Sequence, residues 1–432
     1  MAPKPHIEVE NLEVYFGAVP AVRGVSFTVL HGEQLTLLGP SGCGKTTTLR
    51  AIAGLEKPVA GEIRIDGAPI YSAARDIHVP AEKRGLSMVF QSYAIWPHMT
   101  VFNNVAYGLR VRRKSKKEIE EKVQEMEDIT YHRPVLATEV IELLAPRAGA
   151  LVVDATCGGG GHTEELLRTG ADVLALDQDP EAIEHASEKL IPYGGRVTLR
   201  QINFRNAGEV LDQLGIVSIG GALLDLGVSS RQLENAERGF SVMRNGPLDM
   251  RMDPRRELTA ATIINSYSEE ELTRLFRELG EEPAARRIAS QLVKLRKTSP
   301  FHDTMQLTKA VEKIVWRHGR RHPATQVFQA LRMEVNDELG ALEEGLRVLT
   351  RRLESGSRIA VITFHSLEDR IVKNFFRDRS RELLDRPEWP EPRPNPDLAL
   401  RLITSKPVEP GENEQRVNPR SRSAKLRVAE KL

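Results

Sequence analysis

The sequence has few cysteines, no long hydrophobic run and no excess of charge of one sign. Its 432 residues include only 2 cysteines, Cys43 and Cys157, which excludes a disulfide framework, and we expect both to be reduced. No window approaches the roughly 18 consecutive apolar residues of a membrane-spanning helix, and no apolar signal core follows the first residues. The net charge is +1. These features predict a cytoplasmic protein of two or three domains.

What the sequence does have is two glycine-rich loops. The first, residues 39–46, reads GPSGCGKT. We expect residues 34–38 to form a buried strand before it and residues 47–53 a helix after it, which is the context of a phosphate-binding P-loop. Residues 7–14 alternate apolar and acidic residues as an edge strand would, and residues 25–30 suggest a second strand.

Three further motifs make the first 125 residues resemble an ABC-transporter ATPase of the sugar or ion importer type. They are GEIRIDG at 61–67, MVFQSYAIWPHMTV at 88–101 and NNV at 103–105. The resemblance implies that an aromatic residue stacks on adenine, that loop residues hold the phosphates, and that Thr46 and a glutamine reach magnesium if ATP binds. The ATP-binding residues so implied are Phe16, Gly39, Ser41, Gly42, Gly44, Lys45, Thr46, Thr47 and Gln91.

The second half of that ATPase is missing from the sequence. We find no Leu-Ser-Gly-Gly-Gln signature, no strand ending in Asp-Glu and no switch histidine after Gln91. Because phosphoryl transfer depends on positioning and charge neutralisation by these groups, we expect at most a nucleotide-binding remnant with no hydrolysis. Unpaired strand edges and an incomplete core are further expected consequences.

A charged stretch over residues 110–125 ends this segment. It predicts a helix with basic residues leading and acidic residues trailing, an order that opposes the helix dipole, so we favour a solvated linker over an RNA contact. Met126 then reads like a second start codon, and a new pattern begins.

The second glycine loop, DATCGGGGH at residues 154–162, lies in a different context. A buried strand at 150–154 precedes it, a helix at 163–169 follows, and a strand at 173–177 ends in Asp177. This order is typical of a nucleoside-binding Rossmann-like half, in which the acid accepts both ribose hydroxyls. The loop lacks the spaced Gly-x-Gly-x-x-Gly form, which favours S-adenosylmethionine over NAD.

The sequence after the second loop contains a series of distinctive motifs. They are DLGVSSRQL at 225–233, RGFS at 238–241, GPLDMRMD at 246–253, HPATQVFQALR at 322–332, VNDEL at 335–339, ITFHSLEDRIVK at 362–373 and NPRSRSAKLR at 418–427. With these motifs, residues 126–432 resemble the 16S ribosomal RNA cytosine-N4 methyltransferase family (RsmH/MraW). The resemblance implies a class I S-adenosylmethionine-dependent methyltransferase of α/β fold. It also implies 16S ribosomal RNA within the small ribosomal subunit as partner.

The family's site residues map onto matching positions of this chain. For S-adenosylmethionine they are Gly160, Gly161, His162, Asp177, Phe204, Asp225 and Gln232. Asp225 is the favoured catalytic residue, with His365 and Ser366 as weaker candidates. We expect no metal in this half.

The expected domains are residues 1–125, the methyltransferase residues 126–232 and 324–432, and a helical insertion at 233–323 that recognises RNA. Basic groups at 286–287, 294–297, 317–321 and 416–427 could follow an RNA backbone. Three alternatives stay open: an ABC subunit that binds a permease, a bifunctional methyltransferase regulated by ATP, and an accidental gene fusion.

Overall fold

The computed structural model describes residues 5–39, 43–86, 88, 101–111, 114–116, 118–119, 134–315, 322–385 and 391–432. The chain divides into two compact units, residues 1–114 and 115–432, and each is described by itself. Ser41, Gly42 and Gln91, the junction around Met126 and the basic group at 317–321 lie outside the described residues. No helix of the described ranges is long and apolar enough to cross a membrane.

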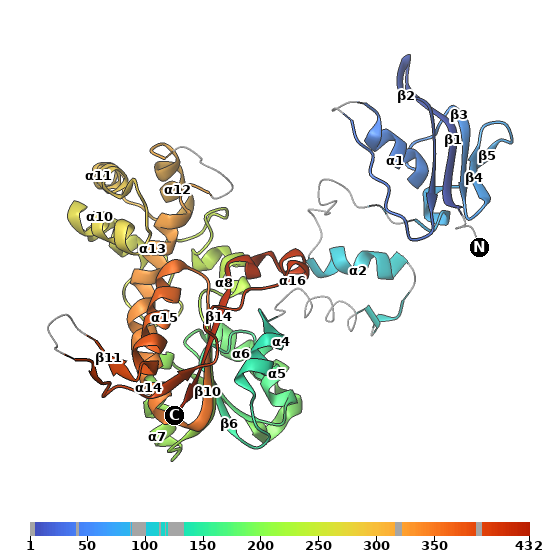
Figure 1. The fold of residues 1–432 in the computed structure, drawn as a ribbon. Helices are drawn as coiled ribbons and strands as arrows, with labels where there is room; N and C mark the ends of the chain where they lie inside the picture. The colour runs from blue at the N-terminus through green and yellow to red at the C-terminus, as the bar shows by residue number, and fades with distance from the viewer. Residues whose placement is uncertain are drawn as a thin grey trace. The chain divides into compact units, whose positions relative to one another are not determined.

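The N-terminal unit is built on a five-stranded antiparallel sheet in the order β2-β1-β3-β4-β5 (Figure 1). Its strands are β1 (Pro5–Phe16), β2 (Val19–Leu30), β3 (Ala60–Ile65), β4 (Ala68–Ser72) and β5 (Ile77–His78), with helices α1 (Lys45–Ala53), η1 (Ala81–Lys83) and α2 (Val101–Val111). The expectation of an edge strand at 7–14 is wrong. A tight turn at Gly17 folds β2 back onto β1, so β1 lies between β2 and β3.

The strand expected at residues 34–38 is absent from the structure. The segment has no regular secondary structure, and Leu35 and Leu38 are 45% and 89% exposed. A strand exists only where neighbouring strands satisfy its backbone groups. The segment belongs to none of the described sheets, and the second half of the ATPase is missing from the sequence. Helix α1 does form after the loop, at Lys45–Ala53, as expected.

The second unit contains a seven-stranded sheet in the order β13-β14-β10-β9-β6-β7-β8. The strands β6 (Leu151–Asp154), β7 (Asp172–Asp177), β8 (Val197–Gln201), β9 (Ile219–Asp225) and β10 (Leu353–Thr363) are parallel, whereas β14 (Lys425–Lys431) and β13 (Leu400–Leu402) run antiparallel. The chain order reverses between β6 and β9. In open α/β sheets, ligands bind at such a switch point, beyond the carboxyl ends of the strands.

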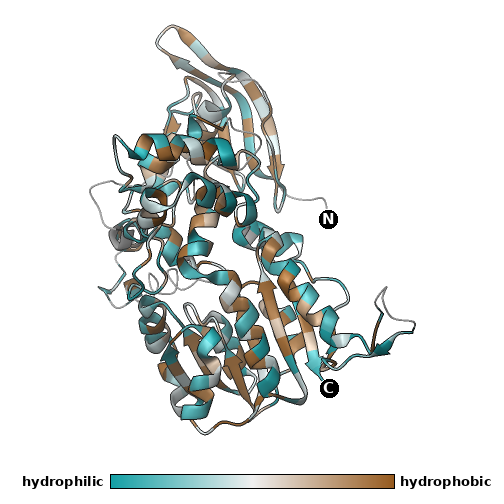
Figure 2. Ribbon diagram, turned by 90° about the vertical axis from the view of Figure 1, so that its left-hand side faces the viewer, coloured by the Kyte–Doolittle hydropathy of each residue, from teal (hydrophilic) through white to brown (hydrophobic). Residues whose placement is uncertain are grey.

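Helices cover both faces of this sheet. One core joins the sheet to α7 (Ala207–Gln213), α14 (Glu338–Arg352) and α15 (Ser366–Ser380), and another joins it to α4 (Ala137–Leu144), α5 (Gly161–Arg168) and α6 (Pro180–Lys189). In Figure 2 the strands are mostly brown and the outer helical faces mostly teal, as expected for strands buried on both sides. The smaller elements are η2 (Ile191–Arg196), η3 (Phe204–Asn206), α8 (Ser230–Glu234), η4 (Ala236–Arg238), β11 (Leu383–Leu384), β12 (Arg393–Pro394), α16 (Glu412–Val417) and η5 (Pro419–Ser423).

The insertion after β9 has a helical core of its own. Helices α9 (Ala260–Ser266), α10 (Glu269–Glu278), α11 (Ala285–Arg296) and α12 (Thr304–Glu312) pack around α13 (Thr325–Asn336). The buried side chains of α13, including Phe328 and Leu331, belong to this core. A boundary at 323/324 therefore separates residues that pack together, since α13 is the helix on which the insertion is assembled.

Candidate functional site

A cavity of about 770 Å³ lies at the carboxyl ends of β6, β7 and β9. Its walls come from the second glycine loop, from the ends of the central strands and from segments of the insertion and the C-terminal region. The lining residues used below are Gly158, Gly161, His162, Asp177, Gln178, Phe204, Asp225, Gln232, Met252, Asn336, Glu338, Glu368 and Arg420. The cavity thus contains six of the seven predicted cofactor residues. Gly160 is not in the lining and instead is the N-cap residue of α5, with a φ of 78°.

Asp177 ends β7 and faces the cavity with both carboxylate oxygens held by backbone groups. The N–H of Gly158 donates to Oδ2 at 2.8 Å, and the N–H of Asp179 donates to Oδ1 at 2.9 Å. Burial raises the pKa of Asp177 to about 6, against these two hydrogen bonds, which lower it. Each oxygen keeps a further lone pair, so the carboxylate can accept from two neighbouring hydroxyl groups of a ligand.

Asp154, at the end of β6, is fully buried and supports the glycine loop. The Thr163 hydroxyl donates to its Oδ2 at 2.6 Å and the Thr156 N–H to its Oδ1 at 3.2 Å. Burial raises the pKa of Asp154. The carboxylate therefore ties the start of the loop to the first turn of α5, and it was not among the predicted site residues.

His162 and Asp225 form the third wall of the cavity. Their Nε2 and Oδ2 atoms are 3.4 Å apart, His162 is 6% exposed, and its Nε2 and Asp225 Oδ1 are buried without a hydrogen-bond partner among the described residues. Burial alone would lower the pKa of His162, but the carboxylates of Asp225, Asp154 and Glu165 together outweigh it and raise that pKa. A buried donor and acceptor without partners are costly, which suits a site completed by a ligand.

Phe204 reaches the cavity because helix α14 has a glycine opposite its ring. A Cβ atom added to Gly345 would lie 2.4 Å from Phe204 Cδ2 and 2.8 Å from Cε2. The ring therefore lies directly against the α14 backbone, with its other side available to the cavity. Nothing in the sequence around Gly345 pointed to this contact, since the two residues are far apart along the chain.

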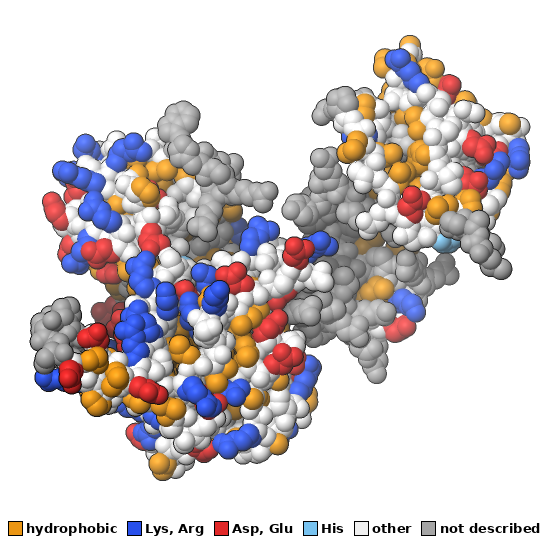
Figure 3. All heavy atoms as spheres, in the orientation of Figure 1, with side chains coloured by type: hydrophobic (Ala, Val, Ile, Leu, Met, Phe, Trp, Pro, Cys, Tyr) orange, Lys and Arg blue, Asp and Glu red, His pale blue; other side chains and the backbone are white. Residues whose placement is uncertain are grey.

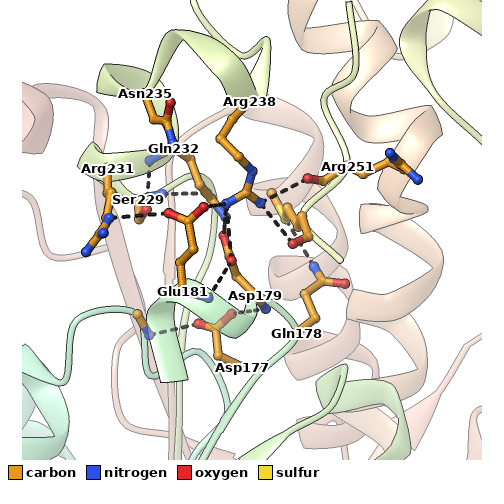
Figure 4. Close-up of polar contacts among 12 residues, drawn as sticks. Asp177, Gln178, Asp179, Glu181, Ser229, Arg231, Gln232, Asn235, Arg238 and Arg251 are labelled. Atoms are coloured by element: carbon orange, nitrogen blue, oxygen red, sulfur yellow. Dashed lines mark hydrogen bonds and ion pairs between the residues drawn. The ribbon is translucent and has the colours of Figure 1, made fainter. Parts of the chain in front are cut away.

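Gln232 lines the cavity, yet its amide is engaged by the protein. Its Oε1 accepts from the Ser229 N–H at 2.9 Å in a capping box at the start of α8, and its Nε2 donates to Asp179 Oδ2 at 2.7 Å. Figure 4 shows Asp179 at the centre of this network, with Arg238 approaching it from the insertion. Sequence reasoning missed Asp179 and Arg238, although both lie within or beside its motifs.

The other two catalytic candidates lie between two residues of the cavity lining, Phe364 and Glu368, without lining it themselves. The Ser366 hydroxyl donates to Glu281. The Nδ1 of His365 caps α15 by accepting from the Glu368 N–H at 3.5 Å, and its Nε2 lies 3.0 Å from Glu368 Oε1. Glu368 does line the cavity. Burial raises its pKa, but His365 and other partners outweigh this and hold that pKa below its usual value.

Glu338 is a further carboxylate in the cavity lining, and the sequence analysis did not single it out. Arg332 holds it with two contacts, Nε to Oε1 at 2.8 Å and Nη2 to Oε2 at 2.9 Å. Glu338, His365 and Glu368 place one potential ligand atom each within 4.8 Å of one another. The Arg332 guanidinium compensates the charge of this cluster, so we assign no metal to it.

In the N-terminal unit, the lysine of the first glycine loop is bonded to the loop itself. Gly44 begins α1 at a φ of 92°, and Lys45 Nζ donates to the Gly39 carbonyl at 2.6 Å. Thr46 is exposed, and Phe16 is 53% exposed. The lysine thus turns onto the loop backbone at the place where it would meet a phosphate.

Comparison with known proteins finds one family for each unit, and the two matches overlap over residues 129–143. Residues 129–432 match the family model of the MraW methylase family, and residues 22–143 match that of the ABC transporter family. The end of the second match includes α4, whose Val140 and Leu144 pack on the seven-stranded sheet. The N-terminal resemblance to an ABC-transporter ATPase is thereby confirmed.

Curated relatives cover the same part of the chain. A "Ribosomal RNA small subunit methyltransferase H" from Carboxydothermus hydrogenoformans is 50% identical over 304 residues, spanning 70% of this chain and 98% of the relative. Another of that name from Geotalea uraniireducens is 48% identical over 308 residues, spanning 70% and 99%. The match to a solved rRNA methylase from Streptococcus thermophilus covers 70% of this chain and 99% of the solved chain, with 14% identity. Its TM-score of 0.33 is too low to establish a shared fold. On the family match and these identities, the chain belongs to the MraW methylase family.

Proposed function

We propose that residues 115–432 transfer a methyl group from S-adenosylmethionine to the exocyclic N4 of a cytosine in 16S ribosomal RNA of the small subunit. The observation that carries the proposal is one cavity lined both by Asp177, whose carboxylate can accept from two ribose hydroxyls, and by the Asp225–His162 pair, in which Asp225 Oδ1 has no hydrogen-bond partner among the described residues. The names of the relatives support ribosomal RNA as substrate. The family resemblance supports cytosine N4.

The residues present fit the cofactor. The loop from Gly158 to Gly161 would let a ligand approach the backbone, Asp177 would accept both ribose hydroxyls, and the Phe204 ring would cover the adenine. Gln232 would act through Asp179, because its own amide is already bonded. When bound, S-adenosylmethionine supplies an electrophilic methyl group on its sulfonium.

Asp225 is the group best placed to help the acceptor react. Cytosine N4 is a poor nucleophile because its lone pair is delocalised into the ring. An amino hydrogen donated to Asp225 Oδ1 would favour a pyramidal N4 with its lone pair free of the ring, and Asp225 Oδ1 would accept the proton that N4 loses on methylation. His162 would hold the Asp225 carboxylate in place through their 3.4 Å contact.

The helical insertion is the proposed RNA-binding part. Arg286, Arg287, Ser290, Gln291 and Lys294 of α11 line a shallow depression, and Lys and Arg side chains gather over α10 and α11 in Figure 3. Cationic side chains along one surface attract a phosphate backbone. Arg420, at the cavity wall, would contact RNA close to the target base. The base must be flipped out of any stack to enter.

The test is methyl transfer by the purified full chain. Immature small subunits and tritium-labelled S-adenosylmethionine should give N4-methylcytidine after nuclease digestion and mass spectrometry. Asp225→Asn should lower kcat by about 100-fold or more, the range of a lost acid–base contact, beyond any loss of cofactor affinity measured separately by calorimetry. Absence of N4-methylcytidine from the parent reaction would refute the proposal.

For residues 1–114 we propose nucleotide binding at most, through Gly39, Gly44, Lys45, Thr46 and Thr47. The lack of a described strand before the loop favours this over an active ABC subunit or an ATP-regulated enzyme. ATP turnover that disappears in Lys45→Ala would revive the alternative. Sequencing of source DNA across residues 125–126, with the intact mass of the native protein, would decide whether the two units form one gene product.

A further inference from the structure

Arg238 connects the insertion to the loop that follows β7. Its side chain is 14% exposed, with Nη1 2.9 Å from Asp179 Oδ2 and 3.3 Å from Glu181 Oε1. Nη2 donates to the carbonyl oxygens of Arg251 and Met252 at 3.1 and 3.0 Å (Figure 4). One guanidinium therefore holds two segments that are about 70 residues apart in the chain.

The segment on the insertion side, residues 249–253, forms part of the cavity wall, and we call it the strap. Met252 lines the cavity, and its sulfur lies 3.0 Å from Gln178 Nε2. The Met252 N–H donates to Asn336 Oδ1 at 2.8 Å, and Asn336 Nδ2 donates to the Met250 carbonyl at 2.8 Å. Met250 has a φ of 64°, which is unfavourable for a residue with a side chain. The strap is thus held in one strained conformation by Arg238 and Asn336.

Asp179 connects Arg238 to Asp177 in the proposed cofactor site. Its carboxylate is 3% exposed, accepts from Gln232 Nε2 and the Glu181 N–H, and pairs with Arg238. Its own N–H donates to Asp177 Oδ1. Removal of the guanidinium would leave a buried carboxylate without a cation, and the 177–181 loop would have to shift to hydrate it.

We infer that Arg238 is a positioning residue that sets the affinity for S-adenosylmethionine by fixing Asp177 through Asp179, and that it thereby couples the cofactor site to the RNA-binding insertion. The inference rests on the proposed cofactor. It predicts that cofactor binding and the placement of the strap are linked, although Arg238 itself is not in the cavity lining. If cofactor binding and the placement of the strap are linked, bound S-adenosylmethionine must slow the hydrogen exchange of the strap amides.

A double-mutant cycle on the full chain tests this inference. S-adenosylmethionine binding is measured by calorimetry for the parent, Arg238→Met, Asp177→Asn and the double variant. Arg238→Met should weaken binding about 10- to 100-fold, as for loss of a buried charged hydrogen bond. Because the residues act in series, the double variant should bind no more weakly than the weaker single variant. Arg255→Met, which removes an arginine 62% exposed beside the strap, is the matched control and should bind like the parent.

The outcomes separate the two proposals. No binding by the parent refutes the proposed cofactor. Parent binding with additive effects of Arg238→Met and Asp177→Asn overturns the positioning role, as does loss of folding in both Arg238→Met and Arg238→Lys. If only Arg238→Met fails to fold, the cycle is run with Arg238→Lys. Lysine keeps the positive charge but lacks the planar guanidinium group that donates to several acceptors. Strap amides unprotected by cofactor in the parent would overturn the coupling.

A separate observation concerns the N-terminal unit, where two histidines meet one carboxylate. His6 Nδ1 and His31 Nε2 lie 2.8 and 2.7 Å from the same oxygen, Asp66 Oδ1, and their ring centroids are 4.3 Å apart. The residues come from β1, the end of β2 and the β3–β4 turn, which the pairing of Pro5 with Leu30 and of Ile7 with Ile65 brings to one end of the sheet. The His6 hydrogen bond, together with the other His6 and His31 contacts, lowers the pKa of Asp66.

We propose that His6, His31 and Asp66 bind a divalent transition-metal ion of the Zn²⁺ class. Two imidazoles and one carboxylate are a common donor set for such ions, and the three ligand atoms lie within 4.8 Å of one another. The residues are half-buried or exposed, so water can complete the coordination. Three adjacent strands fix the donors before the metal arrives.

The metal proposal is tested on the full chain after removal of metals with a chelator. Zn²⁺ titration by calorimetry and the visible absorption of Co²⁺ should report a site that is lost in His31→Ala and in Asp66→Asn. His302→Ala removes another exposed histidine and should leave binding unchanged. Unaltered binding in His31→Ala, or loss of the site in Glu338→Gln instead, would overturn the assignment.

Discussion

Three aspartates end three neighbouring strands, yet their surroundings give them different tasks. Asp154 is fully buried and bonded by Thr163 and Thr156, so it supports the loop. Asp177 receives two backbone N–H groups and keeps lone pairs for a ligand. Asp225 keeps an unpartnered oxygen beside His162. Position at a strand end brings the carboxylates together, and the neighbours of each decide its chemistry.

The raised pKa of Asp177 predicts a pH-dependent affinity for S-adenosylmethionine. Only the carboxylate can accept both ribose hydroxyls, so binding competes with protonation at a pKa of about 6. The Kd should be constant above about pH 7 and should rise about tenfold per pH unit well below pH 6. Calorimetry over this range checks the prediction.

Asp177→Asn is the control for the pH series. It should bind more weakly than the parent above about pH 7 and lose most of the dependence on pH, leaving only what His162, in the same cavity, contributes. A pH profile that Asp177→Asn does not change would show that another group titrates.

Thr163→Val should destabilise the second unit. The substitution keeps the shape of the side chain but removes the hydroxyl that donates to Asp154 at 2.6 Å. An unsatisfied buried carboxylate should lower the free energy of unfolding by about 1–3 kcal/mol. Urea unfolding measures this loss. Because the pKa of Asp154 is already raised, protonation should relieve the cost, so a loss that is larger in acid than at neutral pH would contradict the account.

At the scale of elements, α14 and η3 fit only because a glycine lies between them. Gly345→Ala places a methyl group 2.4 Å from a Phe204 ring atom, so the ring or the helix must move. We expect weaker S-adenosylmethionine binding, by about tenfold, together with overpacking that costs about 1–3 kcal/mol of stability. Calorimetry and thermal unfolding measure the two effects.

Gly340→Ala is a comparison within the same helix, because its added Cβ would meet only the Asp337 carboxylate, the end of a side chain. It should leave cofactor affinity unchanged. Equal losses of affinity in Gly340→Ala and Gly345→Ala would show that α14 tolerates no added methyl group and that Phe204 is not the cause.

Elements also show where local pattern misleads. The apolar run at residues 34–38 reads as a strand, but Leu38 is 89% exposed and the segment pairs with nothing among the described residues. The apolar runs of β6, β7 and β9 are similar in sequence, but each of them pairs with neighbouring strands. A strand is decided by its neighbours, which a local window of sequence does not contain.

At the scale of the whole molecule, the two units differ in completeness. The second has a closed α/β/α core, whereas the first has an antiparallel sheet with a single helix from its P-loop. We therefore expect methyl transfer to be independent of the first unit. Lys45→Ala should leave kcat and KM unchanged, with or without ATP and magnesium. A change in either constant on addition of ATP that Lys45→Ala abolishes would instead support a bifunctional protein.

The sequence by itself predicted which part of the chain belongs to each family and most residues of the proposed cofactor site. Motif order after Met126 predicted the Rossmann-like sheet, the strands ending at Asp154, Asp177 and Asp225, and the family, because short-range patterns encode strand, turn and helix. Only the tertiary structure decided which residues meet across long separations. Arg238 with Asp179, Gly345 with Phe204, and α13 with the insertion core are contacts between segments whose patterns are independent along the chain. Packing and the pairing of buried charges join them, and both exist only in the folded protein.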